Sequence, residues 1–122
     1  MIKINNLTFG YTGYNLFDKL NLEIKDGAIY GLLGKNGAGK TTLLKIITGL
    51  IYPKSGECLI YEELSSLRLP EILKDLFFIP ESFNLPEVSA KQFFELNSTF
   101  YDNFNKEVFY YKLNEFEIPE NT

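Results

Sequence analysis

A glycine-rich run separates two stretches of opposite pattern in this chain. Residues 34–41 read Gly-Lys-Asn-Gly-Ala-Gly-Lys-Thr, and three of the nine glycines fall within the first six of these positions. Before the run, residues 28–33 are apolar without polar alternation, which is typical of a strand buried on both faces of a parallel sheet. After it, apolar side chains recur at helical spacing, at Leu43, Leu44, Ile47 and Leu50. The order of strand, glycine loop and helix predicts an α/β architecture.

The same run has the spacing of a loop that holds phosphate groups: glycine, four residues, then Gly-Lys-Thr. Glycines allow backbone N–H groups to point inward where a Cβ atom would clash, and the helix that begins near Lys40 adds its own amides and dipole. We expect Lys40 to contact the β and γ oxygens of a nucleotide triphosphate and Thr41 to bind its magnesium ion. The other candidate nucleotide-binding residues of the loop are Asn36, Gly37, Ala38 and Gly39. The alternative is a glycine turn that only links strand to helix.

The rest of the chain predicts short strands followed by helices. Alternating apolar residues predict two antiparallel strands joined around Gly13, with a bulge at Asn5 and Asn6 where the alternation slips. Glycine at position 49 is expected just after the end of the helix. Further elements are expected as a strand at 57–61, a helix near 66–74, a strand at 76–79 that Pro80 stops, and two helices after Ser89.

Composition excludes several classes of function. The chain of 122 residues has one cysteine and no histidine, which excludes a disulfide scaffold, the usual zinc sites and serine-histidine catalysis. No apolar run approaches the length of a bilayer span, and the first residues lack the apolar core of a signal peptide, so a cytosolic chain is expected. Residues 1–56 carry a net charge of +4 and residues 57–122 a net charge of −8. The acidic second half argues against nucleic acid as a partner.

Beyond the loop itself, the helix Leu-Leu-Lys-Ile-Ile-Thr-Gly-Leu at 43–50 and the turn Pro-Lys-Ser-Gly-Glu at 53–57 resemble the nucleotide-binding subunit of ABC transporters. The resemblance runs from residue 1 to about residue 101 and is specific, because other phosphate-loop families rarely continue into this helix and turn. It implies binding of ATP with Mg²⁺, and hydrolysis in a head-to-tail homodimer or heterodimer of ATPase subunits. It further implies a membrane permease as partner, and a cytoplasmic location at the inner face of the cell membrane.

The resemblance implies two further site residues in the first half of the chain. Tyr11 lies 29 positions before Lys40, where the family places an aromatic ring that stacks on adenine. Phe9 and Tyr14 are close rivals for this role, and Tyr11 is alternatively one more residue of an alternating strand. Thr42 matches the second hydroxyl of the family loop, which implies a contact with the α-phosphate.

A departure from the family pattern occurs at Glu81. The family usually has glutamine at this position, where the amide contacts magnesium and the attacking water. Glu81 is therefore a candidate catalytic residue together with Lys40, and a candidate magnesium ligand together with Thr41. Some exporter-type members resemble this chain in carrying glutamate here; the alternative is a solvated loop carboxylate.

Three later motifs of the family are not found in this sequence: a signature loop of the Leu-Ser-Gly-Gly type, an apolar strand ending in Asp-Glu, and a switch histidine. We therefore expect an α/β P-loop NTPase of the ABC ATPase type that is truncated, one domain over 1–122. Within it, 1–88 would form part of the nucleotide-binding core and 89–122 the start of the helical subdomain. Such a chain alone would bind nucleotide at most. The alternatives are a small complete phosphate-loop kinase or nucleotide-binding module, and a soluble ABC protein without a transport role.

Overall fold

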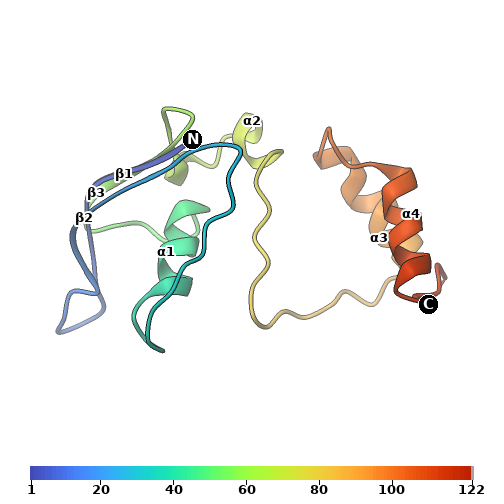
Figure 1. Ribbon diagram of the computed structural model, residues 1–122, viewed down its shortest axis with the longest axis horizontal. Coiled ribbons are helices and arrows are strands. Elements are labelled where there is room, and N and C mark those ends of the chain that lie inside the picture. Colours follow the sequence, from blue (N-terminus) through green and yellow to red (C-terminus); the bar gives the residue numbers. More distant parts are fainter. Residues whose placement is uncertain (122) are drawn as a thin grey trace. The chain divides into compact units, whose positions relative to one another are not determined.

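In the residues that the structure describes, four antiparallel strands form a sheet in the order β2-β1-β3-β4. A computed structural model describes residues 1–121, which divide into one unit over residues 1–79 and a second that begins at Pro80 (Figure 1). The elements of the first unit are β1 (Ile2–Phe9), β2 (Phe17–Ile24), α1 (Lys40–Ile47), β3 (Ser55–Ile60), β4 (Glu63–Leu64), η1 (Ser65–Leu67) and α2 (Pro70–Leu73). Those of the second are α3 (Ala90–Asn97), η2 (Ser98–Phe100) and α4 (Lys106–Glu115).

The predicted hairpin and its bulge are confirmed. Strands β1 and β2 pair with Ile2 opposite Ile24, and the register shifts between Ile4 and Leu7. Asn6 has a left-handed backbone with a φ of +48°. In a regular strand, residues three positions apart face opposite sides, yet Ile4 and Leu7 are both fully buried. The bulge therefore turns both side chains toward the same core.

Helix α1 packs against this core (Figure 1). Its buried apolar residues are Leu43, Ile46 and Ile47, which share one face at spacings of three and four. The predicted stripe included Leu44 and Leu50, but both side chains are exposed, so that part of the prediction is wrong. Gly49 follows the helix with a φ of +71°, as predicted for a residue after a C-terminal cap.

Two predicted strands do not form in the described residues. The segment 28–33 has no strand assignment, and Ile29 and Leu33 are almost fully exposed. The segment 76–79 is also irregular, with Phe77 and Ile79 exposed. A strand takes its backbone hydrogen bonds from neighbouring strands, and the sheet β2-β1-β3-β4 includes neither segment. The predicted burial of 28–33 is therefore wrong for the residues that the structure describes.

The helix predicted near 66–74 is broken in two. Arg68 has a left-handed backbone with a φ of +48° and ends η1, while Leu69 is extended and precedes Pro70 at the start of α2. Proline disfavours helical conformation in the residue before it, which explains the break. The strand predicted at 57–61 is confirmed as β3.

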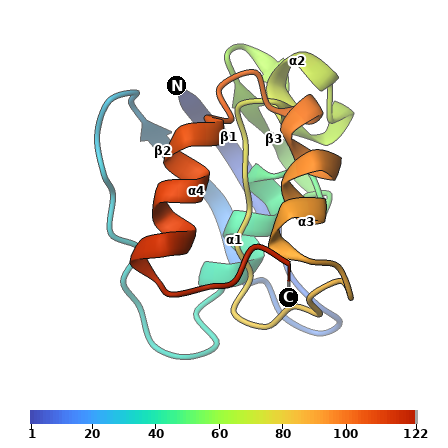
Figure 2. The ribbon, with the colours of Figure 1, turned by 90° about the vertical axis from the view of Figure 1, so that its right-hand side faces the viewer.

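In the second unit, α3 and α4 run side by side in opposite directions (Figure 2). A capping box between Ser89 and Gln92 begins α3, and the Asn105 side chain accepts a hydrogen bond from Val108 N at the start of α4. The helices are joined by aromatic rings in contact, with centroids 5.1–5.9 Å apart, from Phe94, Phe104, Phe109 and Tyr110. The two predicted helices of this region are confirmed.

None of the helices described in residues 1–121 combines the length and the apolar composition needed to cross a bilayer.

Cys58 provides a test of the first unit. Its side chain is buried in β3. Burial raises the pKa of the thiol, and a hydrogen bond with Ser65 lowers the pKa by a smaller amount, so the pKa is raised overall. We expect a thiol reagent to modify Cys58 much more slowly in the native protein than in urea, because the reactive thiolate is both scarce and covered. Since the native pKa is raised, the stability that the protonated thiol contributes is present below the unfolded-state pKa and is lost as the pH rises through the native value. Labelling followed by mass spectrometry measures both rates; equal rates would contradict the packing of β3.

Candidate nucleotide-binding site

The glycine loop leads directly into α1, and its backbone requires glycine at two positions. Gly37 and Gly39 have φ angles of +81° and +99°, in the left-handed region that other residues rarely adopt. A Cβ atom at Gly39 would also lie 2.7 Å from Leu16 Cδ2 and 2.8 Å from Phe17 Cζ. The end of the β1–β2 hairpin therefore packs against the loop at its last glycine.

Lys40 folds back over the loop that precedes it. Its Nζ donates hydrogen bonds to the carbonyl oxygen of Gly34 at 2.5 Å and to that of Lys35 at 3.1 Å. An ammonium group has three N–H donors, so these two contacts leave one for a further acceptor. The side chain spans the loop and presents a positive charge where the loop meets the helix.

The first turn of α1 offers backbone amides to an anion. The helical hydrogen bonds begin with Leu43 N donating to Gly39 O at 2.8 Å, so the amides of Lys40, Thr41 and Thr42 precede them. Gly39 provides no capping side chain, and the first turn contains no acidic residue. Amides in this position and the positive end of the helix dipole both favour phosphate. The amide of Ala38 instead donates to Lys35 O at 3.1 Å and closes the turn of the loop.

Tyr11 lies next to the first turn of α1. Its hydroxyl is 3.2 Å from Thr42 Oγ1, and its ring is about half exposed. The ring of Phe9 meets it edge-on with centroids 5.3 Å apart, and the Tyr14 ring lies 6.5 Å away. The structure thus places Tyr11, which precedes Lys40 by 29 positions, at the loop and in contact with Thr42. Stacking on a base remains a prediction.

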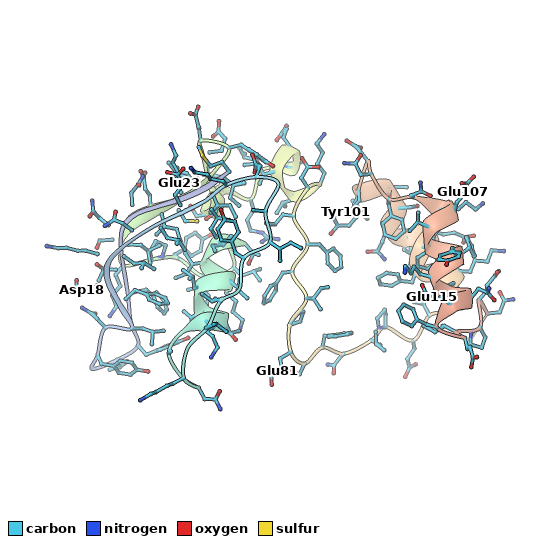
Figure 3. All side chains as sticks on the ribbon, viewed as in Figure 1. Asp18, Glu23, Glu81, Tyr101, Glu107 and Glu115 are labelled. Atoms are coloured by element: carbon cyan, nitrogen blue, oxygen red, sulfur yellow. The ribbon has the colours of Figure 1, made fainter. Side chains whose placement is uncertain are left out.

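Thr41 is exposed in the first turn of α1, while Glu81 belongs to the second unit. Figure 3 shows Glu81 on the extended segment that precedes α3, and its side chain is exposed. Its role at magnesium or in catalysis therefore stays a prediction.

Sequence reasoning missed one residue that shapes the loop, and it missed the acceptor role of two others. Leu16 packs against Gly39, and Gly34 and Lys35 hold Lys40 through their carbonyl oxygens. Every residue type has a backbone carbonyl, so the sequence does not show which carbonyls act as acceptors. Leu16 was detectable only as an apolar residue in the connection between the two predicted strands.

Comparison with known proteins agrees with this geometry. A profile of the ABC transporter family matches residues 17–118. The bacitracin transport ATP-binding protein BcrA of Bacillus licheniformis is 43% identical over 81 residues, which cover 66% of this chain and 26% of that protein. The matched part of this chain therefore spans about a quarter of that relative.

Solved structures share the fold. An ATP-binding subunit of an ABC transporter superimposes with a TM-score of 0.79 at 26% identity, over 98% of this chain and 52% of that one. An ATP-binding cassette captured as a dimer in a post-hydrolysis state with ADP and Pi gives a TM-score of 0.67 at 28% identity, over 94% of this chain and 55% of the other. The chain thus matches about half the length of these structures.

The family resemblance inferred from the loop, the helix and the turn at 53–57 is confirmed by the profile, which covers more than half of the chain. The α/β P-loop fold of ABC ATPase subunits is confirmed by the solved structures. This chain belongs to the ABC transporter family and carries sequence of its ATP-binding domain.

Proposed function

We propose that this chain forms the ATP- and magnesium-binding part of an ABC transporter ATPase subunit. The observation that carries the proposal is the loop itself, which Lys40 closes from within and which opens onto the first turn of α1. The positive charge of Lys40 and the uncapped backbone amides of the first turn of α1 lie together in one short segment. In the complete subunit, binding and hydrolysis of ATP would drive transport, and this chain by itself would bind nucleotide without turning it over.

Each loop residue has a task in this proposal. The amides from Asn36 to Thr42, apart from that of Ala38, which donates to Lys35 O, surround the phosphates. Lys40 neutralises the β and γ oxygens with its remaining N–H donor, and the Thr42 hydroxyl contacts the α-phosphate. The backbone at Gly37 and Gly39 supports this assignment, because it lets the loop curve around an anion without a Cβ atom in the way.

Magnesium fits the exposed hydroxyl of Thr41, because this ion is usually held by one or two protein oxygens together with substrate phosphates and water. When bound, it would neutralise charge on the phosphates. Glu81 is proposed as a second ligand and as a residue that orients the attacking water. Lys40 would hold the phosphates in place while that water approaches.

The partners are proposed from the relatives. BcrA is named a bacitracin transport protein, and one of the matching cassettes is a dimer. We therefore propose that the subunit acts as a homodimer or heterodimer with a membrane permease, at the cytoplasmic face of the cell membrane. Nucleic acid is not proposed as a partner because residues 57–122 carry a net charge of −8. The division of the domain at 88 and 89 into core and helical parts is likewise part of the proposal.

The base-binding role of Tyr11 gives the sharpest test of this proposal. Replacing Tyr11 by alanine removes an aromatic face, so affinity for ATP and for GTP should fall together by about 5- to 100-fold, since a ring face does not read the edge of a base. Calorimetry with both nucleotides in the presence of Mg²⁺ measures the change. Tyr14→Ala is the matched control, because the Tyr14 ring lies 6.5 Å from that of Tyr11 and should leave both affinities unchanged. A loss confined to Tyr14→Ala would move the stacking role to that residue.

A further inference from the structure

The hydroxyl of Tyr11 has a partner that base stacking does not explain. It lies 3.2 Å from Thr42 Oγ1, and this bond joins the segment after β1 to the first turn of α1. Stacking uses only the face of the ring, so phenylalanine would serve equally well for that purpose. Stacking therefore does not explain why residue 11 has a hydroxyl group.

Counting protons fixes the direction of this bond when phosphate is present. A threonine hydroxyl donates one proton and accepts others, whereas a phosphate oxygen at neutral pH only accepts. When Thr42 gives its proton to the α-phosphate, it has none left for Tyr11. The geometry of the pair allows either oxygen to be the donor. Once Thr42 donates to phosphate, the bond between the two side chains requires Tyr11 to donate to Thr42 Oγ1.

Both side chains are held so that such a relay can form. The Tyr11 ring meets the edge of Phe9 at an interplanar angle of 85°, and Thr42 is only 8% exposed in the first turn of α1. When the Tyr11 hydroxyl donates from one side of Thr42 Oγ1, the Thr42 hydroxyl favours a rotamer in which its own proton points away from Tyr11. Donation to that oxygen also polarises the hydroxyl and strengthens its bond to an anion.

We propose that Tyr11 is a positioning residue for phosphate: its hydroxyl donates to Thr42 Oγ1 and thereby aims the single Thr42 proton at the α-phosphate. The inference rests on the proposed function of the loop and deepens it. One residue then acts on both ends of the nucleoside, with its ring at the base and its hydroxyl, through Thr42, at the first phosphate.

Three probes separate the two roles in the full chain: Mg-ATP, Mg-tripolyphosphate, which lacks a base, and adenosine, which lacks phosphate. Tyr11→Phe keeps the ring and removes the hydroxyl. We expect it to weaken ATP and tripolyphosphate alike, by about three- to tenfold, as for loss of one hydrogen bond. Adenosine affinity should not change. Calorimetry serves for the two phosphates, and competition with a fluorescent nucleotide serves for adenosine.

Variants of Thr42 test the route of the effect. In a Thr42→Val background, which lacks the hydroxyl, Tyr11→Phe should cause no further loss for ATP or tripolyphosphate. In a Thr42→Ser background, which retains it, the three- to tenfold effect should persist. Tyr14→Phe removes a hydroxyl from the neighbouring ring and is the matched control, with no change expected for any probe. Circular dichroism confirms that the variants remain folded.

Three results would overturn the inference: equal phosphate affinity in Tyr11→Phe and the parent chain, tighter binding in Tyr11→Phe, or an undiminished effect of Tyr11→Phe in the Thr42→Val background. Tighter binding would mean that the bond competes with nucleotide. If the parent chain bound neither ATP nor tripolyphosphate, the proposed function of the loop would itself fail. That outcome is distinct from one in which both bind and Tyr11→Phe has no effect.

Discussion

Replacing Lys40 by alanine is expected to weaken binding of Mg-ATP by about 10- to 150-fold. The ammonium group folds over the loop, where it contacts the carbonyl oxygens of Gly34 and Lys35. A charge-assisted bond to phosphate contributes about 1.5–3 kcal/mol, and Lys40 has one N–H donor left for such a bond, so its loss reduces affinity by about 10- to 150-fold. Isothermal calorimetry with ATP and Mg²⁺ measures the difference.

Lys35→Ala is the matched control for Lys40→Ala. Lys35 is exposed and contributes its backbone carbonyl to the loop, which the substitution retains. It removes the same formal charge five positions away, so the general electrostatic attraction for ATP falls equally. We expect a change within about threefold, because exposed charges are well screened. Equal ATP affinity for the parent chain and Lys40→Ala would show that the loop does not bind phosphate through this lysine and that its assignment is wrong.

Gly49→Ala is expected to destabilise the first unit through backbone strain and overpacking together. Gly49 has a φ of +71°, and a Cβ atom there would lie 2.2 Å from the carbonyl oxygen of Ser65. The end of α1 and η1 would have to separate, and the hydrogen bond from Arg68 Nη1 to Thr48 O would be disturbed. Backbone strain and overpacking together predict a loss of about 3 kcal/mol in the free energy of unfolding.

Gly13→Ala separates strain from packing. Gly13 also has a left-handed backbone, with a φ of +96°, but a Cβ atom there would meet nothing within 4 Å. A loss of about 1 kcal/mol is expected from the backbone alone. Labelling of Cys58 at increasing urea concentration reports on the first unit specifically, because Cys58 is the single cysteine of the chain and is buried in β3. Similar urea midpoints for the two variants would contradict the close contact at Gly49.

Local patterns predicted the parts of this fold that depend on neighbouring residues in the chain. The extent of α1, the turn at Gly49 and the bulge at Asn5 and Asn6 each follow from a few consecutive residues. The strands predicted at 28–33 and 76–79 have suitable composition, but a strand forms only with a partner. Because no described strand pairs with either segment, composition alone gave the wrong result.

The same distinction applies to the candidate site. The spacing of glycine, lysine and threonine predicted which residues occupy the loop. It contained no information on where the Lys40 ammonium group rests, since its acceptors are backbone carbonyls common to every residue. The bond between Tyr11 and Thr42 links positions 31 residues apart and depends on how the hairpin packs on α1. Tertiary packing decides contacts of this kind.

The bulge in β1 has a consequence for the site at the other end of the strand. It sets the phase of the β1 residues that follow, so that Leu7 faces the core and Phe9 packs against it, with the centroids of the Phe9 and Tyr11 rings 5.3 Å apart. Side chains alternate along a strand, so inserting or deleting one residue between Leu7 and Phe9 would reverse the side on which the Phe9 ring lies and remove its edge-on contact with Tyr11, and a change of two would restore that side. The edge contact that supports the ring we propose for the base is therefore determined by parity, counted from the middle of the sheet.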